Sequence, residues 1–401
     1  MCGEHEFDFG LDMGLSPLVN SLIKKEDLEG KEETFPLRLV RCRACSLVQV
    51  EHPIDGHKIY QEQDYLYYSS DMPGLSDYFK HYSEDLKDRF LSDYDFLDLV
   101  VEIGSNDGIM LQHFMDKNRV LGVDPSTNVA IRAIKNGVPT LPLFFTERLA
   151  KQIKAEYGPA KVIYGNNCIA HINDLDTVMK GVTHLLDEKG VFVVECNYWG
   201  GMVKNKNYSL VYHDHFSYFS LQNWIDYGAK FGLKVFDAIV TPAQGGSLRV
   251  FMSPKTRKPT PNFLELKKEE EATKLNTQET FLRYRMECME EARKLLEVVR
   301  DLKAQNKSIA AYGAAAKGFS VLQLAGITSE IWYFVDDSPA KQGKYTPINH
   351  TPVISRAEAQ DRLPDYFFIT APNYAEVIMA KEKDFLAKGG KFLLCDSTVV
   401  R

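Results

Sequence analysis

Two histidines bracket an aspartate in the segment "VYHDHFSYFS", residues 211–220. Imidazole groups titrate near neutral pH, so His213 and His215 could act as general bases or as metal ligands. If the segment is one extended strand, both histidines lie on one face, and Tyr212 and Asp214 lie on the other. Hydrogen-bonded histidines in a buried aromatic wall are the alternative without chemistry. The segment alone leaves all three interpretations open.

A second group of functional residues lies in "DLVVEIGSNDGIML". A strand is expected to end at Glu102, Gly104 permits a tight turn, and Gly108 lets a following helix approach closely. About 20 residues later, "VLGVDPS" ends the next apolar run at Asp124, where a carboxylate can accept hydrogen bonds from ribose hydroxyls. No Gly-Lys-Ser/Thr follows, which excludes a Walker A loop. The alternative is a plain turn with a surface aspartate.

The pattern E-x-G-x-x-x-G with a strand-terminal aspartate resembles the S-adenosylmethionine (SAM) site of class I methyltransferases. The residues expected to contact SAM come from this loop, from "VDPS" and from the later "YGNN"; they are Glu102, Gly104, Ser105, Asp107, Gly108, Asp124, Pro125, Asn166 and Asn167.

Cys42 and Cys45 form a C-x2-C pair in a segment that alternates like a hairpin. Cys2 and His5, spaced C-x2-H, could supply the other two ligands of a closed, tetrahedral zinc site. Such a site has no open coordination position, so its role is expected to be structural. Unligated thiols in a small β unit are the alternative.

Composition places these residues in a globular chain of two or three domains. The chain has 401 residues, 44% hydrophobic and 26% charged, and its net charge of −7 argues against nucleic-acid binding. No window reaches the ~18 apolar residues of a membrane span, and the N-terminus lacks signal-peptide features. We therefore expect a cytoplasmic protein whose seven cysteines are free or bound to metal.

Short β-branched runs alternate with helical stretches through the middle of the chain and predict a parallel, doubly wound α/β sheet. The runs are "FLDLVVEIGSND", "RVLGVDPS", "AKVIYGNNCIAHI" and "GVFVVECNY", with "KVFDAIV" and "GSLRVFMS" closing the sheet in antiparallel fashion. A helix is expected through 77–90. Residues 262–307 predict one connecting helix, and 308–401 start a second α/β series. The expected domains are 1–75, 76–260 and 261–401.

The carboxyl ends of parallel strands form the ligand crevice of such sheets. "VYHDHFSYFS" follows the fourth run, and "YGNNCIAHI" ends the preceding strand with Asn167 and His171 at the same rim. Histidine, tyrosine and aspartate beside a methyl donor are suited to proton transfer. Position in the sheet thus favours acid–base chemistry for the opening segment.

With these motifs placed, the chain resembles the sugar C-methyltransferases, SAM-dependent enzymes that act on nucleotide-linked 4-keto-deoxy sugars. The resemblance covers nearly the whole chain in three parts. The N-terminal zinc-binding part matches "LDMGLSPLVNSLI" and "CRACSLVQV"; the SAM domain matches "EIGSNDG", "NNCIAH", "VYHDHFSYFS" and "GGSLRV"; the C-terminal domain matches "YGAAAKG", "VDDSPAKQGK" and "APNYAEVI".

The resemblance implies that His171, Tyr212, Asp214 and His215 transfer protons, with His215 as the favoured general base. A 4-keto group acidifies the hydrogen on C3, so a base could form an enolate that attacks the methyl group of SAM. Tyr212 or His171 would stabilise the oxyanion. Zinc has no part in this reaction.

The resemblance and the charges also suggest substrate contacts. The tyrosines of "YLYYSS" would line the sugar pocket, and cationic side chains would bind the diphosphate, helped by the helix that begins at "GAAAKG". The expected substrate-binding residues are Tyr65, Tyr68, Gln244, Arg249, Lys317 and Lys341, with Lys344 as a further candidate.

Three positions depart from the family pattern. Asp214 stands where the family usually has glutamate, and Gln244 stands where it usually has histidine. The first zinc pair of the family is C-x2-C-G, and "MCG" retains only Cys2, which leaves His5 as a substitute ligand.

Two other functions remain open at this level. An O-methyltransferase would place its base at a hydroxyl, and a non-catalytic protein would only bind SAM or a nucleotide sugar. In all three cases the expected partner is a small molecule, with no nucleic acid or membrane, and the protein is expected to be a monomer or dimer.

Overall fold

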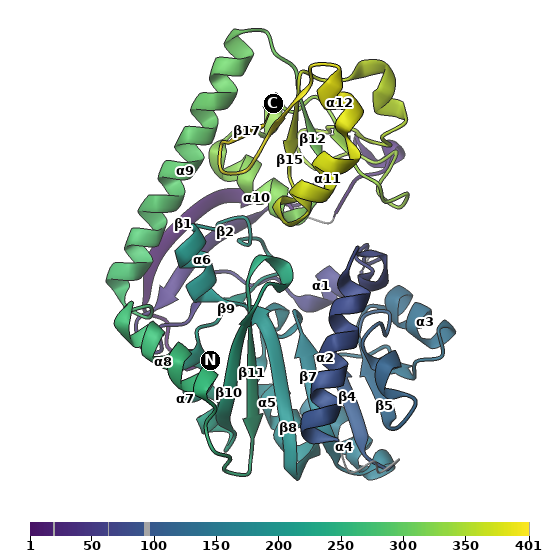
Figure 1. Ribbon diagram of the computed structural model, residues 1–401, viewed down its shortest axis with the longest axis vertical. Helices are drawn as coiled ribbons and strands as arrows, with labels where there is room; N and C mark the ends of the chain where they lie inside the picture. Colours follow the sequence, from purple (N-terminus) through teal and green to yellow (C-terminus); the bar gives the residue numbers. More distant parts are fainter. Residues whose placement is uncertain (19–20, 63, 92–96, 401) are drawn as a thin grey trace.

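Three β-sheets organise the chain in the computed structural model, which describes residues 1–18, 21–62, 64–91 and 97–400 (Figure 1). A seven-stranded sheet and a six-stranded sheet form the two ends of the molecule in this view, and a four-stranded sheet lies between them. The long helix α9 (Gln278–Ala304) runs along one side and joins the two ends. Among the described residues, no helix is both long enough and apolar enough to span a membrane.

The four-stranded sheet is built mainly from the N-terminal residues, in the order β1-β2-β3-β9. β2 (Phe35–Cys42) and β3 (Val48–Val50) form the antiparallel hairpin expected from the sequence. β1 (Phe7–Ser16) pairs with β2, and the sequence analysis had not assigned it to a strand. The fourth strand, β9 (Ser217–Tyr218), comes from the segment 211–220 and pairs with β3.

The seven-stranded sheet has the order β10-β11-β8-β7-β4-β5-β6 and confirms the expected doubly wound α/β fold. Five strands are parallel, and β11 runs antiparallel between β8 and β10, as predicted. The strands are β4 (Leu99–Ile103), β5 (Arg119–Val123), β6 (Thr140–Leu141), β7 (Ala160–Asn166), β8 (Leu186–Asn197), β10 (Lys234–Thr241) and β11 (Ser247–Ser253).

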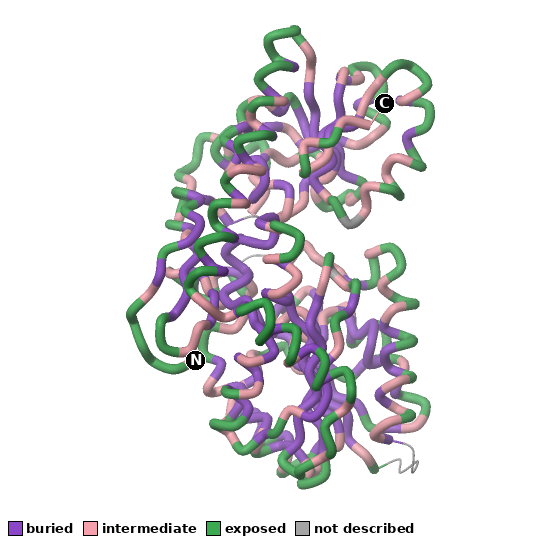
Figure 2. The backbone as a smooth tube through the Cα atoms, turned by 60° about the vertical axis from the view of Figure 1, so that its left-hand side comes forward, coloured by how far each residue is buried: buried purple, intermediate pink, exposed green. Residues whose placement is uncertain are grey.

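Alternate residues of the central strands pack against helices on opposite faces of this sheet. Val100 and Val162 belong to a core with α2 (Leu75–Phe90), which covers the predicted helix. Val101 and Ile163 belong to a core with α4 (Glu147–Tyr157) and α5 (Leu175–Leu185). Figure 2 shows the buried strands between more exposed helices. The remaining helices of this part are α1 (Gly56–Tyr60), α3 (Thr127–Lys135), α6 (Trp199–Asn205) and α7 (Leu221–Lys230).

The segment after β4 differs from expectation. Turns and a short 3-10 helix, η3 (Leu111–Phe114), follow the loop where we expected an α-helix. Gly108 is still required there, because a Cβ at this position would lie 2.8 Å from Cβ of Val138, and its φ is +81°. The glycine therefore allows the segment that precedes β6 to pack closely, whereas we expected a helix to pack there.

The connecting region consists of two helices rather than one. α8 (Pro261–Ala272) ends before a turn in which Lys274 has a φ of +52°, and α9 then restarts with Thr277 as its N-cap. The threonine side chain accepts a hydrogen bond from the Thr280 amide, which favours a new helix start. Residues at helical spacing along α9 are buried on one face; they are Phe281, Cys288, Ala292, Leu295 and Val299.

The six-stranded sheet confirms the second α/β series, in the order β14-β13-β12-β15-β16-β17. Only β17 is antiparallel. Its elements are β12 (Ile309–Tyr312), α10 (Ala316–Ala325), β13 (Phe334–Val335), β14 (Val353–Ile354), β15 (Tyr366–Ile369), α11 (Ala375–Lys381), α12 (Lys383–Ala387), β16 (Lys391–Leu393) and β17 (Val399–Val400). The strand order reverses between β12 and β15, where ligands bind in open α/β sheets.

Candidate active site

The loop after β4 has the geometry of a nucleoside-binding turn. Gly104 has a φ of +67°, and a Cβ there would lie 2.5 Å from Cβ of Cys168, so only glycine fits. Asp124 ends β5 and accepts hydrogen bonds from the amides of Asn106 (2.8 Å) and Ser126 (2.9 Å). Burial raises the pKa of Asp124 to about 6. The carboxylate therefore holds the loop and lies at its base.

Several buried polar atoms around this loop have no hydrogen-bond partner among the described residues. They are Ser105 Oγ, Asp107 Oδ1, Asn166 Oδ1 and Asn167 Oδ1, at the carboxyl ends of β4 and β7. Unpaired buried polar atoms are costly, which makes them natural partners for a bound ligand. The residues present thus fit the polar groups of SAM.

Glu102 and Pro125 also lie at this loop. The Glu102 carboxylate is buried and accepts a hydrogen bond from the Tyr164 hydroxyl at 3.2 Å, and burial raises its pKa. The Pro125 carbonyl accepts a hydrogen bond from Gln61 at 3.4 Å. The structure therefore gathers all nine expected cofactor-binding residues at the ends of neighbouring strands.

The segment 211–220 is not one extended strand, so the alternation of faces considered for it does not apply. The His215 amide donates to the Tyr212 carbonyl at 3.0 Å, so the chain turns there before β9 begins. The turn places Tyr212 and His215 on the same side, with ring centroids 4.0 Å apart. The Tyr212 hydroxyl lies 2.8 Å from His215 Nε2.

Hydrogen bonding assigns the tautomer of His215. Nδ1 lies 2.8 Å from the Leu210 carbonyl, which only accepts, so Nδ1 carries the proton. Nε2 is then unprotonated and accepts from the Tyr212 hydroxyl. Asn197 Nδ2 lies 3.1 Å from Nδ1 and 3.3 Å from Nε2. The imidazole is held with a proton-accepting nitrogen turned toward the tyrosine.

His171 joins this group from the neighbouring strand end, with its ring centroid 4.9 Å from that of His215. Its Nδ1 lies 3.0 Å from the Tyr60 hydroxyl, and the Tyr60 ring packs 5.3 Å from the Tyr65 ring. Tyr60 was not among the expected residues, although it lies only five positions before Tyr65. We call His171, His215, Tyr212, Tyr60 and Tyr65 the His–Tyr cluster.

Burial sets the protonation of this cluster. Burial, and then the charge of His171, lower the pKa of His215 well below its usual value. Burial also lowers the pKa of His171 to about 4. Burial first, and then the charge of Asp214, raise the pKa of Tyr212. At neutral pH both histidines are uncharged and can accept a proton, while the tyrosines keep theirs.

The cluster adjoins the nucleoside loop. The Phe216 amide donates to the Ala170 carbonyl at 2.8 Å, and Cys168 Sγ donates to the Ile103 carbonyl at 2.9 Å. The charges of both Asp124 and Asp214 act on Tyr65, whose pKa is raised mainly by burial. The segment that carries His215 and the strand end that carries His171 therefore lie next to the loop.

His213 lies outside the cluster. Its ring packs edge-on against Phe35 of β2, with centroids 6.0 Å apart, and it is fully buried. Burial lowers the pKa of His213. His213 is thus packed in an aromatic wall, but neither ring nitrogen has a hydrogen-bond partner among the described residues, so only the packing part of that interpretation fits.

The expected substrate residues are divided by the structure. Tyr65 belongs to the cluster, but the Tyr68 hydroxyl accepts from Asn128 at 2.8 Å and its ring lies under Arg132, over α3. The side chain of Gln244 lies outside the described part of the chain.

The cationic candidates are divided as well. Arg249 is buried in an ion pair with Glu195 at 2.9 Å and stacks on Tyr82, so its guanidinium is not available to a diphosphate. Lys341 pairs with Asp336 at 3.2 Å and donates to the Ala314 carbonyl at 2.8 Å. Lys317 begins α10, close enough to the cluster for its charge to act on His215.

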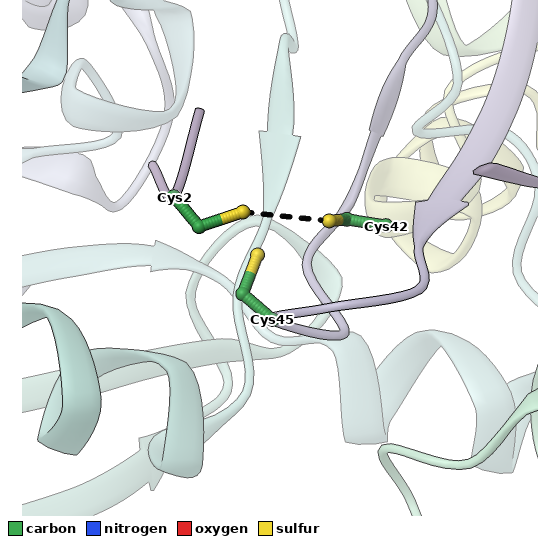
Figure 3. Close-up of side chains that lie close together, drawn as sticks. All are labelled: Cys2, Cys42 and Cys45. Carbon is green, nitrogen blue, oxygen red and sulfur yellow. Dashed lines mark hydrogen bonds between the residues drawn. The ribbon is translucent and has the colours of Figure 1, made fainter. Parts of the chain in front are cut away.

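Three cysteines converge as expected. The ligand atoms of Cys2, Cys42 and Cys45 all lie within 4.8 Å of one another, and the sulfurs of Cys2 and Cys42 are 3.5 Å apart (Figure 3). Cys42 ends β2 and Cys45 lies in the turn before β3, while the Arg43 amide holds the N-terminal segment by donating to the Glu6 carbonyl. Thiol ligands at this spacing suit zinc. His5 is exposed and is not among the residues brought together there, so its role as a ligand stays a prediction.

Comparisons with known proteins cover all three parts. Residues 1–60 match the family model described as "Putative zinc binding domain", 77–238 match "Methyltransferase domain", and 242–395 match "C-methyltransferase C-terminal domain". The chain is 34% identical over 399 residues to the C-methyltransferase NovU of Streptomyces niveus, covering 98% of this chain and 94% of that protein.

Solved structures resemble the chain more remotely. A SAM-dependent methyltransferase from Clostridium acetobutylicum has a TM-score of 0.35 at 12% identity, covering 44% of this chain and 92% of its own. Geranyl diphosphate C-methyltransferase from Streptomyces coelicolor has a TM-score of 0.34 at 12% identity, covering 51% of this chain and 91% of its own.

Proposed function

Because the chain belongs to the family of SAM-dependent C-methyltransferases, we propose that it methylates C3 of a nucleotide-linked 4-keto-deoxy sugar. Carbon methylation needs a base that can take a proton from carbon. The observation that supports this most is the buried His215, whose Nδ1 is bonded to a backbone carbonyl and whose unprotonated Nε2 accepts from the Tyr212 hydroxyl.

SAM, when bound, supplies an electrophilic methyl group. Asp124 would accept hydrogen bonds from its ribose hydroxyls, and the unpaired atoms of Ser105, Asp107 and Asn167 would bind its other polar groups. His215 Nε2 takes the C3 proton, and the Tyr212 hydroxyl, released from Nε2, donates to the keto oxygen. Tyr60 and Tyr65 would form one wall of the sugar pocket.

Zinc would be held by Cys2, Cys42 and Cys45, with the fourth ligand outside the group that the described residues bring together. Zinc there would stabilise the turn between β2 and β3 and would take no part in proton transfer.

The proposal predicts loss of one C3 hydrogen for each methyl gained. With a nucleotide-linked 4-keto-6-deoxyhexose deuterated at C3, mass spectrometry should show a product that has gained one methyl and lost the deuterium. O-methylation would keep the deuterium, and that product would overturn carbon methylation in favour of a sugar hydroxyl.

Asp124→Ala should weaken SAM binding by about 1.5–3 kcal/mol, because the ribose hydroxyls lose a charged acceptor. Calorimetry of the SAM complex measures this. Since the pKa of Asp124 is raised to about 6, wild-type affinity should fall as the pH drops below that value, and the variant should lose this dependence. Unchanged affinity in the variant would remove Asp124 from the site.

A further inference from the structure

Helix α10 of the C-terminal sheet is fixed against both other parts of the molecule. Ser320 Oγ donates to the Val211 carbonyl at 2.7 Å, at the start of the segment that carries His215. One turn later, Gln323 Nε2 donates to the Met13 carbonyl of β1 at 2.6 Å. The first turn of α10 is therefore held in one position relative to the His–Tyr cluster.

Lys317 lies in that first turn, three residues before Ser320. Residues three apart share a helix face, so Lys317 is carried on the side of α10 that contacts the segment 211–220. Burial lowers the pKa of Lys317 to about 8. After burial and the charge of His171, the charge of Lys317 further lowers the pKa of His215.

Ionised groups are few around the cluster. The three tyrosines of the cluster are protonated and its two histidines are neutral at pH 7. The charges that act on them come from Asp124, Asp214 and Lys317. Both carboxylates would oppose formation of a further negative charge. A cation would favour it, most strongly in a site from which water is excluded.

We propose that Lys317 stabilises the enolate oxygen formed when His215 takes the C3 proton, a role that rests on the proposed function above. The C3–H electron pair becomes the C3–C4 double bond, and the carbonyl π pair moves to the oxygen on C4. The proton stays on Nε2, and the oxygen takes its negative charge beside the ammonium group. When C3 forms its bond to the methyl, the methyl–sulfur bond of SAM would break with its electron pair left on the sulfur, and the oxygen regains its double bond to C4.

This role makes the active site composite. The N-terminal part reaches the cluster through the pairing of β3 with β9 and through Tyr60 and Tyr65. The part that contains the seven-stranded sheet supplies both histidines, and the C-terminal part supplies the cation. Diphosphate binding, the role that the sequence suggested for Lys317, makes a different prediction about affinity.

Lys317→Met should slow solvent exchange of the C3 hydrogen of a nucleotide-linked 4-keto-6-deoxyhexose about 10²–10³-fold, followed by NMR in deuterium oxide. Affinity for SAM, and for UDP or dTDP alone, should not change, and Lys317→Arg should recover part of the rate. Lys307→Met is the matched control, because Lys307 precedes β12 at its opposite end and pairs with Asp365. Its exchange rate should equal that of the wild type.

Two results would overturn the role. Exchange at the wild-type rate in Lys317→Met removes Lys317 from enolate formation, and a tenfold loss of UDP or dTDP affinity with intact exchange assigns it to the diphosphate. If the wild-type protein exchanges no C3 hydrogen, the proposed function itself fails.

A second measurement needs no sugar substrate. In protein with 15N-labelled histidine and bound SAM, the His215 ring resonance, assigned by its loss in His215→Gln, should follow a titration near pH 8. That change should vanish in Lys317→Met. The tyrosines titrate well above this range and Asp124 and His171 below it, so a wild-type resonance that stays constant here would show that Lys317 does not face His215.

Discussion

His215→Gln will slow exchange of the C3 hydrogen about 10²–10⁴-fold, which is the usual effect of removing a general base. Its affinity for SAM will stay within twofold of the wild-type value. Glutamine is close in size and can keep a hydrogen bond to the Leu210 carbonyl, but its amide is not basic. Exchange followed by NMR reports proton removal directly, and calorimetry reports SAM binding. The loss should appear in the exchange rate and in methyl transfer alike.

His213→Gln is the matched control, because His213 lies two residues away and packs on Phe35, outside the cluster. Its exchange rate per folded molecule should equal that of the wild type. If His215→Gln exchanges normally and His171→Gln does not, the base is His171, which is one ring contact away.

The pH dependence of the C3 exchange rate tests the protonation state of His215 independently. Burial lowers the pKa of His215, so its neutral, base-competent form persists below the ordinary histidine value near 6.5. At saturating SAM, and at pH values where Lys317 is mostly protonated, the wild-type exchange rate should therefore stay level as the pH falls from about 7 to 6 and decline only at lower pH.

Cys42→Ser will reduce the zinc content from about one per chain to near zero and will lower the unfolding midpoint. Structural zinc in small sites contributes about 10–16 kcal/mol of apparent binding energy, and one missing thiolate removes most of it. Cys42 is buried at the end of β2, so the lost metal also frees the turn that Cys45 occupies. Metal analysis and thermal unfolding with and without a chelator measure both effects.

Cys395→Ser provides the comparison, because its thiol lies in the C-terminal part and donates to the Ile369 carbonyl. It should keep full zinc content. Wild-type protein that is folded and free of zinc, with a midpoint that a chelator does not change, would contradict the metal assignment for the three cysteines.

Local sequence patterns predicted those parts of the site whose residues lie close together along the chain, in one strand and the turn that follows it. The loop at Gly104 and the strand-terminal Asp124 follow from glycine spacing and apolar runs, and C-x2-C in a hairpin anticipated the cysteine cluster. The turn at 212–215 was missed because alternating aromatic residues also suit an extended strand. Only the tertiary fold, through the pairing of β9 with β3, determines where that strand begins.

Long-range contacts explain the remaining differences. Tyr60 reaches His171 across 111 positions of sequence, and Arg249 pairs with Glu195 from the adjacent antiparallel strand. Nothing in the residues near Arg249 distinguishes a buried ion-pair partner from a phosphate ligand. His5 lies outside the cysteine group because spacing specifies separation along the chain but not the direction of a side chain before β1.

The pairing of β9 with β3 limits how this protein can be recombined. The chain reads as three modules that could be exchanged among relatives, but the third and fourth strands of the N-terminal sheet come from different modules. In a chimaera whose junction lies between residues 60 and 77, the β2–β3 hairpin of a relative would have to pair with the native β9. That strand follows His215, the proposed base, by two residues. Active hybrids should therefore arise when residues 1–60 and 211–220 are inherited together, so the two segments form one unit of exchange.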